Sequence, residues 1–210
     1  MKKAILFDMD GVLLNSEYAV RQCCIQVLQD YGVTAQHEDF IPFTGMGEDR
    51  FIGGVAEKYG LTYETAMKDR VYALYGQHPE WVETFEGVPE LIRALKKKYL
   101  LAVASSADEI KVGINLRCMG LDRSDFDAIV TGTQIRQKKP DPEIYLTAAA
   151  LLQVAPEDCI VVEDAVAGVL AGRAAGAEVI GILGSFSKEE LEAAGAGTIC
   201  QKTRELQRLL

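Results

Sequence analysis

The chain has 210 residues, 49% of them hydrophobic and 25% charged, which is the composition of a folded protein with one large domain or a core and a smaller appended domain. Its formal net charge is −9 and its basic residues form no dense run beyond residues 96–98, which disfavours a nucleic-acid-binding protein. The apolar segment after the N-terminal lysines ends at Asp8, too early for a secretion signal, and no stretch approaches the length of a membrane-spanning helix.

The cysteines and histidines favour neither a disulfide framework nor a metal site built from these residues. The five cysteines are odd in number and lack metal-ligand spacing, and the two histidines, His37 and His78, lie far apart in the sequence. We therefore expect reduced thiols, a cytoplasmic location, and no nucleic-acid or membrane partner. We also expect a monomer or a weak dimer.

The first predicted element is a buried strand over residues 4–7, with the sequence AILF. Two carboxylates, Asp8 and Asp10, follow it directly, separated by Met9 and followed by Gly11. Two anions at the end of a buried strand are costly unless a cation or a proton compensates them. This segment is therefore the first candidate for a functional site.

Residues 16–82 contain helical patterns but no strand candidate. Three such patterns occur, and each ends in a glycine, at Gly32, Gly60 and Gly76. A purely helical stretch after the first strand is not part of a continuous winding of strands and helices. We therefore predict a helical domain over residues 16–82, inserted into a core domain of residues 1–15 and 83–210.

From residue 83 onward, apolar runs alternate with helical patterns. The predicted strands cover residues 100–104, 127–131, 159–162, 178–182 and, more weakly, 198–200. The predicted helices cover residues 88–98, 108–119, 142–153, 165–175 and 187–194. This alternation predicts the α/β class, with a Rossmann-like parallel sheet covered by helices on both faces.

Polar residues with distinctive chemistry follow four of the predicted strands. They are Asp8 and Asp10 after 4–7, Ser105 and Ser106 after 100–104, Lys139 after 127–131, and Glu163 and Asp164 after 159–162. Ligands of open α/β sheets bind at the carboxyl ends of the strands, so we expect these residues to meet at one edge of the sheet.

The residue types in this set fit a phosphate site with a divalent cation. Carboxylates at 4 Å repel by about 1 kcal/mol per pair in water and by several times more in a partly buried site. Hard oxygen ligands that leave room for water and phosphate suit Mg²⁺. Ser105 and Lys139 can hold an anion, and Asp8 and Asp10 leave an extended segment on the same side. Asp8 can then act as a nucleophile on phosphorus and Asp10 as a general acid and base.

The motifs DMDGV, AVASS, KKPDPE and VVEDAVAGVLAGRAAG, in this order, resemble those of the haloacid dehalogenase superfamily of phosphotransferases over nearly the whole chain. The helical insertion resembles the α-helical cap of the phosphoglycolate phosphatase and β-phosphoglucomutase branch. The resemblance implies that Asp8 is the nucleophile, through an aspartyl phosphate, and that Asp10 is the acid/base. It also implies that Ser105 and Lys139 hold the phosphate.

The resemblance further implies a Mg²⁺ ion held by Asp8, the backbone carbonyl of Asp10, and Asp164. Glu163 either helps directly or through water, or has a structural role, and we leave these alternatives open. Ser106 is a second phosphate-binding candidate whose alternative role is that of a helix cap. Lys138 is expected to face solvent.

The helical insertion supplies weaker candidates for substrate contacts. The glycine-rich break FTGMGEDR, residues 43–50, contains Glu48 and Arg50, and a guanidinium suits an anionic substrate group. Asp49 is also a candidate, although acidic residues in a first helical turn explain Glu48 and Asp49 almost as well. Lys68 is a further candidate on the next helix.

These observations predict a Mg²⁺-dependent phosphatase of a small phosphorylated metabolite, a sugar or polyol phosphate. The alternative is a phosphomutase of the β-phosphoglucomutase type, which would use the same aspartyl phosphate. The resemblance to mutases predicts a histidine in the first cap helix and an arginine at position 48, but no histidine occurs between Asp10 and His37, and position 48 is Glu48. A non-catalytic interaction module is disfavoured because every chemical position is filled.

Overall fold

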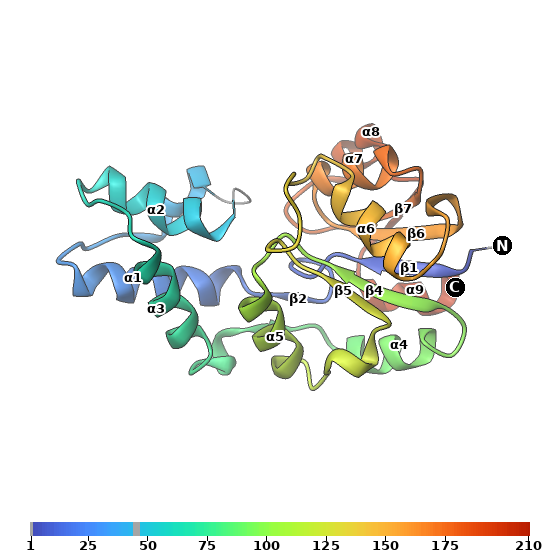
Figure 1. Ribbon diagram of the computed structural model, residues 1–210, viewed down its shortest axis with the longest axis horizontal. Coiled ribbons are helices and arrows are strands. Elements are labelled where there is room, and N and C mark those ends of the chain that lie inside the picture. Colours follow the sequence, from blue (N-terminus) through green and yellow to red (C-terminus); the bar gives the residue numbers. More distant parts are fainter. Residues whose placement is uncertain (1, 44–46) are drawn as a thin grey trace. The chain divides into compact units, whose positions relative to one another are not determined.

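The computed structural model describes residues 2–43 and 47–210 and divides the chain into two compact units (Figure 1). The core unit consists of Met1–Asn15 and Thr84–Leu210, and the helical unit consists of Ser16–Glu83. Where the chain leaves and re-enters the core unit, two short strands, β2 (Leu14–Asn15) and β3 (Glu83–Thr84), form a two-stranded sheet. No helix in the described part of the chain is long and apolar enough to cross a membrane.

The core unit contains a six-stranded parallel sheet, which confirms the predicted α/β class. Its strands are β1 (Ala4–Phe7), β4 (Leu100–Ala104), β5 (Ala128–Val130), β6 (Cys159–Glu163), β7 (Glu178–Ile182) and β8 (Thr198–Cys200). Their order in the sheet is β5-β4-β1-β6-β7-β8. Phe7 at the end of β1 lies opposite Val103 of β4 and Val162 of β6. The winding direction reverses at β1, and such a reversal opens a crevice beyond the carboxyl ends of the central strands.

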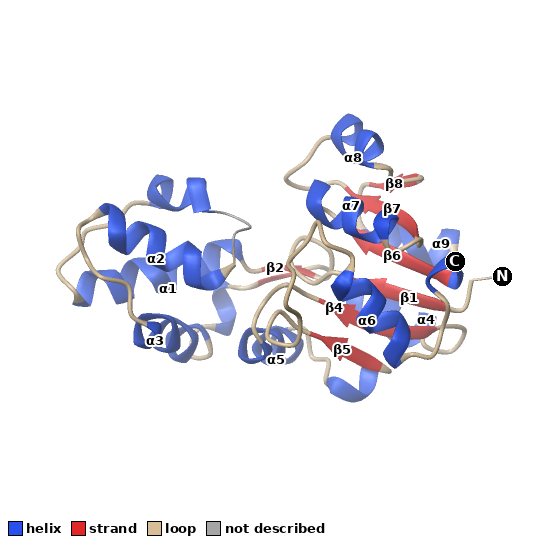
Figure 2. Ribbon diagram, turned by 45° about the horizontal axis from the view of Figure 1, so that its top comes forward, coloured by secondary structure: helices blue, strands red, loops and turns tan. Residues whose placement is uncertain are grey.

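Helices cover both faces of this sheet, which explains why its strands are apolar runs without alternation. All four residues of β1 are buried, and Ala4 and Leu6 belong to one apolar cluster with residues of α6 (Glu143–Leu151) and α7 (Val166–Ala174). Figure 2 shows α6 and α7 on one face and α4 (Val88–Leu95) on the other. The remaining helices of the core unit are α5 (Glu109–Cys118), α8 (Lys188–Ala194) and α9 (Leu206–Leu209).

The start of α6 lies one residue later than the sequence predicts. Pro142 is the residue before the first helical turn, and the carboxylate of Asp141 accepts a hydrogen bond from the backbone N–H of Glu143 at 2.9 Å. Asp141 therefore satisfies a first-turn amide from outside the helix. This contact fixes the end of the segment that carries Lys139.

The described residues of the helical unit, 16–43 and 47–83, form three α-helices and two short 3₁₀ segments. The helices are α1 (Glu17–Asp30), α2 (Glu48–Lys58) and α3 (Thr65–Tyr75), and the 3₁₀ segments are His37–Phe43 and Pro79–Trp81. The segment His37–Phe43 was not predicted, because its apolar residues have no helical period and Pro42 lies within it.

Asp39 links the 3₁₀ segment His37–Phe43 to the end of α2. Its carboxylate accepts hydrogen bonds from the Gln36 backbone N–H at 2.7 Å, from Lys58 at 2.6 Å and from the Tyr59 hydroxyl at 2.8 Å. The backbone N–H of Gln36, followed by Lys58 and Tyr59, lowers the pKa of Asp39 to about 2. These contacts stabilise the ionised carboxylate and with it the junction of the two elements.

Two adjacent glycines in α2 let aromatic rings pack directly on the helix backbone. A Cβ atom at Gly54 would lie 2.4 Å from the Phe43 ring, and one at Gly53 would lie 3.0 Å from the Tyr63 ring. Packing therefore requires glycine at position 54. At position 53, a Cβ atom would make a tight contact that a small shift of the Tyr63 ring can relieve.

Gly54→Ala is expected to destabilise the helical unit by about 1–3 kcal/mol, because overpacking outweighs the gain in helix propensity. Gly53→Ala, in the same helix and with the same gain in propensity, is the matched control and should cost clearly less. The measurement is the urea unfolding midpoint followed by circular dichroism. An equal or more stable Gly54→Ala variant would contradict the packing argument.

Candidate active site

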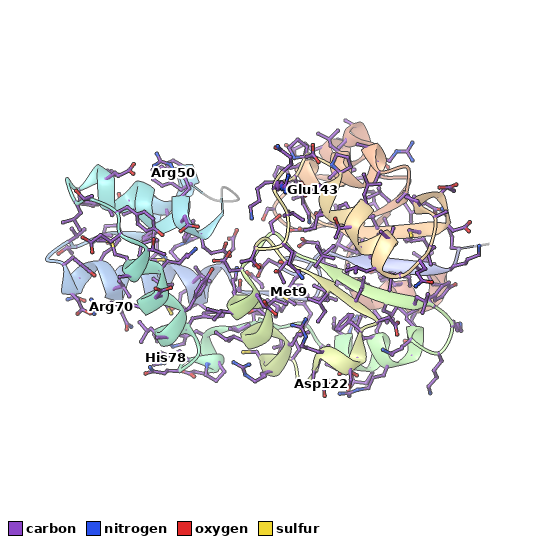
Figure 3. The ribbon with its side chains drawn as sticks, viewed as in Figure 1. Met9, Arg50, Arg70, His78, Asp122 and Glu143 are labelled. Carbon is purple, nitrogen blue, oxygen red and sulfur yellow. The ribbon has the colours of Figure 1, made fainter. Side chains whose placement is uncertain are left out.

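The segment after β1 separates two carboxylates from the buried side chain between them. The backbone N–H of Asp8 donates to the Val162 carbonyl at 2.9 Å, which extends the sheet by one residue. Met9, labelled in Figure 3, is fully buried in the core unit. Asp10 is partly exposed. Gly11 then turns the chain with φ of 80°. The pattern DMD thus directs the Met9 side chain into the core and lets the two carboxylates leave the segment on its other side.

Lys139 bridges two carboxylates at the carboxyl ends of the neighbouring strands β1 and β6. Its Nζ lies 2.5 Å from Asp8 Oδ1 and 2.5 Å from Glu163 Oε1. Burial lowers the pKa of Lys139, but Asp8 and Glu163 more than compensate and raise it well above its usual value. The site therefore contains a buried ammonium ion between two carboxylates.

The carboxylate of Glu163, the last residue of β6, is surrounded by donors from the protein. Oε1 accepts from Lys139 at 2.5 Å and from the Tyr145 hydroxyl at 2.9 Å, and Oε2 accepts from the backbone N–H groups of Asp164 and Ala165 at 2.9 Å each. These contacts fit the structural role considered for Glu163, and they also hold the ammonium group of Lys139. A direct or water-mediated contact of Glu163 with a metal stays a prediction.

Asp164 packs against the turn that follows Asp10. A Cβ atom at Gly11 would lie 2.0 Å from Asp164 Oδ2, so the absence of a side chain at Gly11 makes room for this carboxylate. Burial, followed by Glu163 and Asp8, raises the pKa of Asp164 to about 8. Burial is also the largest cause that raises the pKa of Asp8 to about 7, against the opposing effect of Lys139. The carboxylates are thus close enough to disfavour one another's ionisation.

Four carboxyl groups gather at this site, and carboxylate oxygens are ligands that a divalent cation such as Mg²⁺ prefers. Lys139 pairs with Asp8 and Glu163, and Lys111 pairs with Asp10. Asp164 lies close enough to Glu163 and Asp8 for both to raise its pKa. Over the described residues, no three His, Cys, Asp or Glu side chains form a group that could hold a metal. A cation here would therefore also need backbone carbonyls or water as ligands.

Ser105 and Ser106 lie in the turn after β4. Ser105 is buried, its backbone N–H donates to the Val130 carbonyl at 3.0 Å, and its hydroxyl accepts from the Ala107 N–H at 3.2 Å. Ser106 is half-buried and does not cap α5, because Asp108 occupies the cap position. Both serines therefore lie in the turn between β4 and α5, beyond the carboxyl end of the strand.

Lys138 is exposed, as expected, and its ammonium group also contacts two backbone carbonyls. Its Nζ donates to the carbonyls of Gly132 at 3.0 Å and Ser106 at 3.3 Å. The N–H of Gly132 also donates to the Ala107 carbonyl at 2.8 Å. Lys138 thus ties the loop after β5 to the serine turn after β4, while its neighbour Lys139 points to the carboxylates.

Helix α5 contributes two polar contacts to the segment after β1 that the sequence analysis missed. Lys111 Nζ lies 2.9 Å from Asp10 Oδ2, and Asn115 Nδ2 donates to the sulfur of Met9 at 3.3 Å. Both polar residues are buried and lie four positions apart, so they share one face of the helix. The sequence indicates this only through the spacing of Lys111 and Asn115, which places both on the same face of the helix as its buried apolar residues.

The candidate residues of the helical unit make ion pairs within that unit. Asp49 accepts from the Tyr63 hydroxyl at 2.5 Å and from Lys68 at 2.9 Å. Arg50 pairs with Glu57 at 2.6 Å, and Glu48 is the first residue of α2. Of the predicted glycine-rich break 43–50, residues 44–46 lie outside the described part of the chain.

Comparison with known proteins identifies relatives over most of the chain. The haloacid dehalogenase-like hydrolase family matches residues 5–182. Protein SUPPRESSOR OF QUENCHING 1, chloroplastic, of Arabidopsis thaliana is 43% identical over 203 residues, which cover 93% of this chain and 19% of that protein. A phosphorylated carbohydrates phosphatase of Thermotoga maritima is 34% identical over 214 residues, which cover 94% of each protein. The crystal structure of a putative beta-phosphoglucomutase from Thermotoga maritima has a TM-score of 0.81 and 31% identity, with 99% of this chain and 100% of that chain covered.

Gly168 on α7 makes room for the carboxylate of Glu163, and its replacement tests this packing. A Cβ atom at Gly168 would lie 1.7 Å from Glu163 Oε1. Gly168→Ala is therefore expected to displace Glu163 from Lys139 and to cost about 1–3 kcal/mol of stability. The control is Gly113→Ala on α5, where the nearest atom, of Arg117, is 3.8 Å away. Urea unfolding and a crystal structure of each variant provide the measurements, and an unmoved Glu163 in Gly168→Ala would contradict the expectation.

Proposed function

The chain belongs to the haloacid dehalogenase-like hydrolase family, and we propose that it is a Mg²⁺-dependent phosphatase that hydrolyses a small phosphorylated metabolite. The observation that carries this proposal is the convergence of Asp8, Lys139 and Glu163, three residues far apart in the sequence, at 2.5 Å contacts beyond the sheet. The likeness to a phosphorylated carbohydrates phosphatase supports a sugar or polyol phosphate as the substrate.

Asp8 and Asp10 have different roles in the proposed reaction. An oxygen of Asp8 attacks phosphorus, a bond from phosphorus to Asp8 forms, and the bond to the ester oxygen breaks as Asp10 gives that oxygen a proton. Water then attacks the phosphorus of the aspartyl phosphate, Asp10 accepts a proton of the water, and the bond between phosphorus and the Asp8 oxygen breaks. Inorganic phosphate leaves, and Asp8 is regenerated.

The phosphoryl group is proposed to bind between Lys139 and the serine turn. Lys139 supplies a buried positive charge next to Asp8, and Ser105 and Ser106 supply donors in the turn between β4 and α5. Lys138 supports this site through the Ser106 carbonyl. Because the contacts of Lys139 are made within the protein before substrate arrives, its charge is already in place when the reaction begins.

Asp8, Asp164 and the backbone carbonyl of Asp10 are the proposed Mg²⁺ ligands, and Glu163 is proposed to contribute directly or through water. When bound, Mg²⁺ would offset the negative charge of the carboxylates and of the phosphoryl group. Asp164 is packed against Gly11, so it is held beside the turn that carries the Asp10 carbonyl.

Glu48, Arg50 and Lys68 remain the proposed substrate contacts of the helical unit. Arg50 and Lys68 are paired with Glu57 and Asp49, respectively. In the Arg50–Glu57 pair both side chains are about half exposed, at 49% and 53%. Such an exposed pair contributes little stability, so an anionic substrate group can replace the Glu57 carboxylate at low cost. The Lys68 side chain is only 14% exposed, so the same argument does not extend to its pair with Asp49.

Asp8→Asn is expected to abolish phosphate release from every ester that the wild-type protein hydrolyses, with an unchanged fold. The matched control is Asp158→Asn, which removes a surface carboxylate paired with Lys3. Phosphate release is measured over a panel of sugar and polyol phosphates with Mg²⁺, and circular dichroism checks the fold. Chelation by EDTA should stop the reaction and added Mg²⁺ should restore it. Turnover by Asp8→Asn at the wild-type rate would refute the proposed nucleophile.

The second candidate function is a phosphomutase, which the likeness to a putative beta-phosphoglucomutase favours. The absence of a histidine between Asp10 and His37 and the presence of Glu48 argue against it. Incubation with β-glucose 1-phosphate and a glucose bisphosphate primer separates the two reactions. We expect inorganic phosphate as the product, and accumulation of glucose 6-phosphate without phosphate would identify a mutase instead.

A further inference from the structure

A charged residue lies on the buried face of α5, directly against the proposed acid/base. Lys111 is 7% exposed, and its Nζ lies 2.9 Å from Asp10 Oδ2. Its helix neighbour Val112 is fully buried, whereas Ile110 on the preceding position is exposed. The chain thus buries a lysine and exposes an isoleucine in the first turns of one helix, the reverse of what packing alone favours.

The position of this lysine is explained by its contact with the turn after β1 rather than by the stability of α5. Burying an ammonium ion is unfavourable unless a partner of opposite charge is close, and an apolar side chain of similar length would fill the same space. Asn115, one turn further along α5, donates to Met9 in the same turn. Two polar residues at i and i+4 therefore hold neighbouring residues of the segment that carries both proposed catalytic carboxylates.

We propose that Lys111 is a positioning residue for Asp10. Asp10 lies beyond β1, in an isolated bridge to Leu14 rather than in the six-stranded sheet, and its side chain is 31% exposed. The contacts of its carboxylate therefore decide which rotamer it adopts. Lys111 is anchored in a helix and binds one carboxylate oxygen, which holds the direction of the whole group. This inference rests on the proposed function, because it assigns Lys111 to the residue that exchanges protons with the ester oxygen and with water.

Positioning matters at this residue because proton transfer requires a short and directed contact. A general acid or base acts over about 2.6–3.2 Å and contributes about 10²–10⁴-fold to the rate. A carboxylate that samples other directions spends part of its time outside that range, and this lowers the rate without changing substrate binding. Loss of the Lys111 contact should therefore slow the chemical step, and it should do so more for esters whose leaving group needs a proton.

The test compares Lys111→Met with Lys111→Arg on two esters, a hexose phosphate and p-nitrophenyl phosphate. Because nitrophenolate leaves without protonation and a sugar alkoxide does not, kcat/KM of Lys111→Met should fall about tenfold or more for the hexose phosphate and much less for the aryl ester. Lys111→Arg keeps the charge and should recover most of the activity. Lys188→Met, which removes an exposed lysine of α8, is the matched control and should behave as wild type.

A double-mutant cycle isolates the link between the two residues. If Lys111 acts through Asp10, Lys111→Met should not slow a protein that already carries Asp10→Asn. The inhibition constant of inorganic phosphate should be unchanged in Lys111→Met, since positioning does not involve phosphate binding. Circular dichroism and urea unfolding of each variant separate these effects from loss of the fold, and Lys111→Arg provides the folded reference.

Other results would overturn the inference. An equal loss on both esters, an additive loss with Asp10→Asn, or weaker inhibition by phosphate would assign Lys111 to packing or to phosphate binding. A fully active Lys111→Met variant would overturn this inference alone. A wild-type protein that hydrolyses no phosphate ester would instead refute the proposed function, so the two failures are distinguishable.

Discussion

The burial of several carboxylates at the end of a parallel sheet is the constraint on which the site depends. Asp8 and Asp164 have raised pKa values, chiefly because of burial, and only specific contacts can keep such groups together. Lys139 supplies one of these contacts by lying 2.5 Å from both Asp8 and Glu163. A single ammonium ion joins the carboxylate of Asp8, which follows β1, to that of Glu163, the last residue of β6. The carboxyl ends of the two central strands and the segment before α6 are therefore linked through this group.

Glycines, which have no side chain, leave the space that this arrangement requires. Gly11 lies against the carboxylate of Asp164, and Gly168 lies against that of Glu163, at distances where a Cβ atom would overlap the oxygens. A third glycine, Gly132, lies against the Ser106 carbonyl, where a Cβ atom would be 2.1 Å away. Each glycine allows one loop or helix to approach a polar group closely. The site therefore depends on close packing of the backbone around it as much as on the residues that carry charge.

The parts of the fold and the site that local patterns specify were predictable, and those that depend on long-range packing were not. Apolar runs predicted the strands of the parallel sheet, and the ordered motifs predicted the family, which the match over residues 5–182 confirms. The contacts of Lys111 and Lys138 were not predicted, because they join segments that are far apart in the sequence. Lys111 contacts Asp10 in the segment after β1, and Lys138 contacts the Ser106 carbonyl in the turn after β4. Both lysines look like surface residues in the sequence, where only the i, i+4 spacing of Lys111 and Asn115 indicates a shared buried face.

The pairing of each aspartate with its own lysine explains how two carboxylates two residues apart can carry different roles. Asp8 is buried and contacts Lys139 from the segment before α6, whereas Asp10 is partly exposed and contacts Lys111 from α5. In the proposed reaction a nucleophile must keep its charge beside the phosphoryl group, while an acid/base must reach the ester oxygen and water. Lys139, which contacts both Asp8 and Glu163, suits the first task. Lys111, which lies on a helix and contacts one oxygen of Asp10, suits the second. The identical side chains therefore differ through what contacts them.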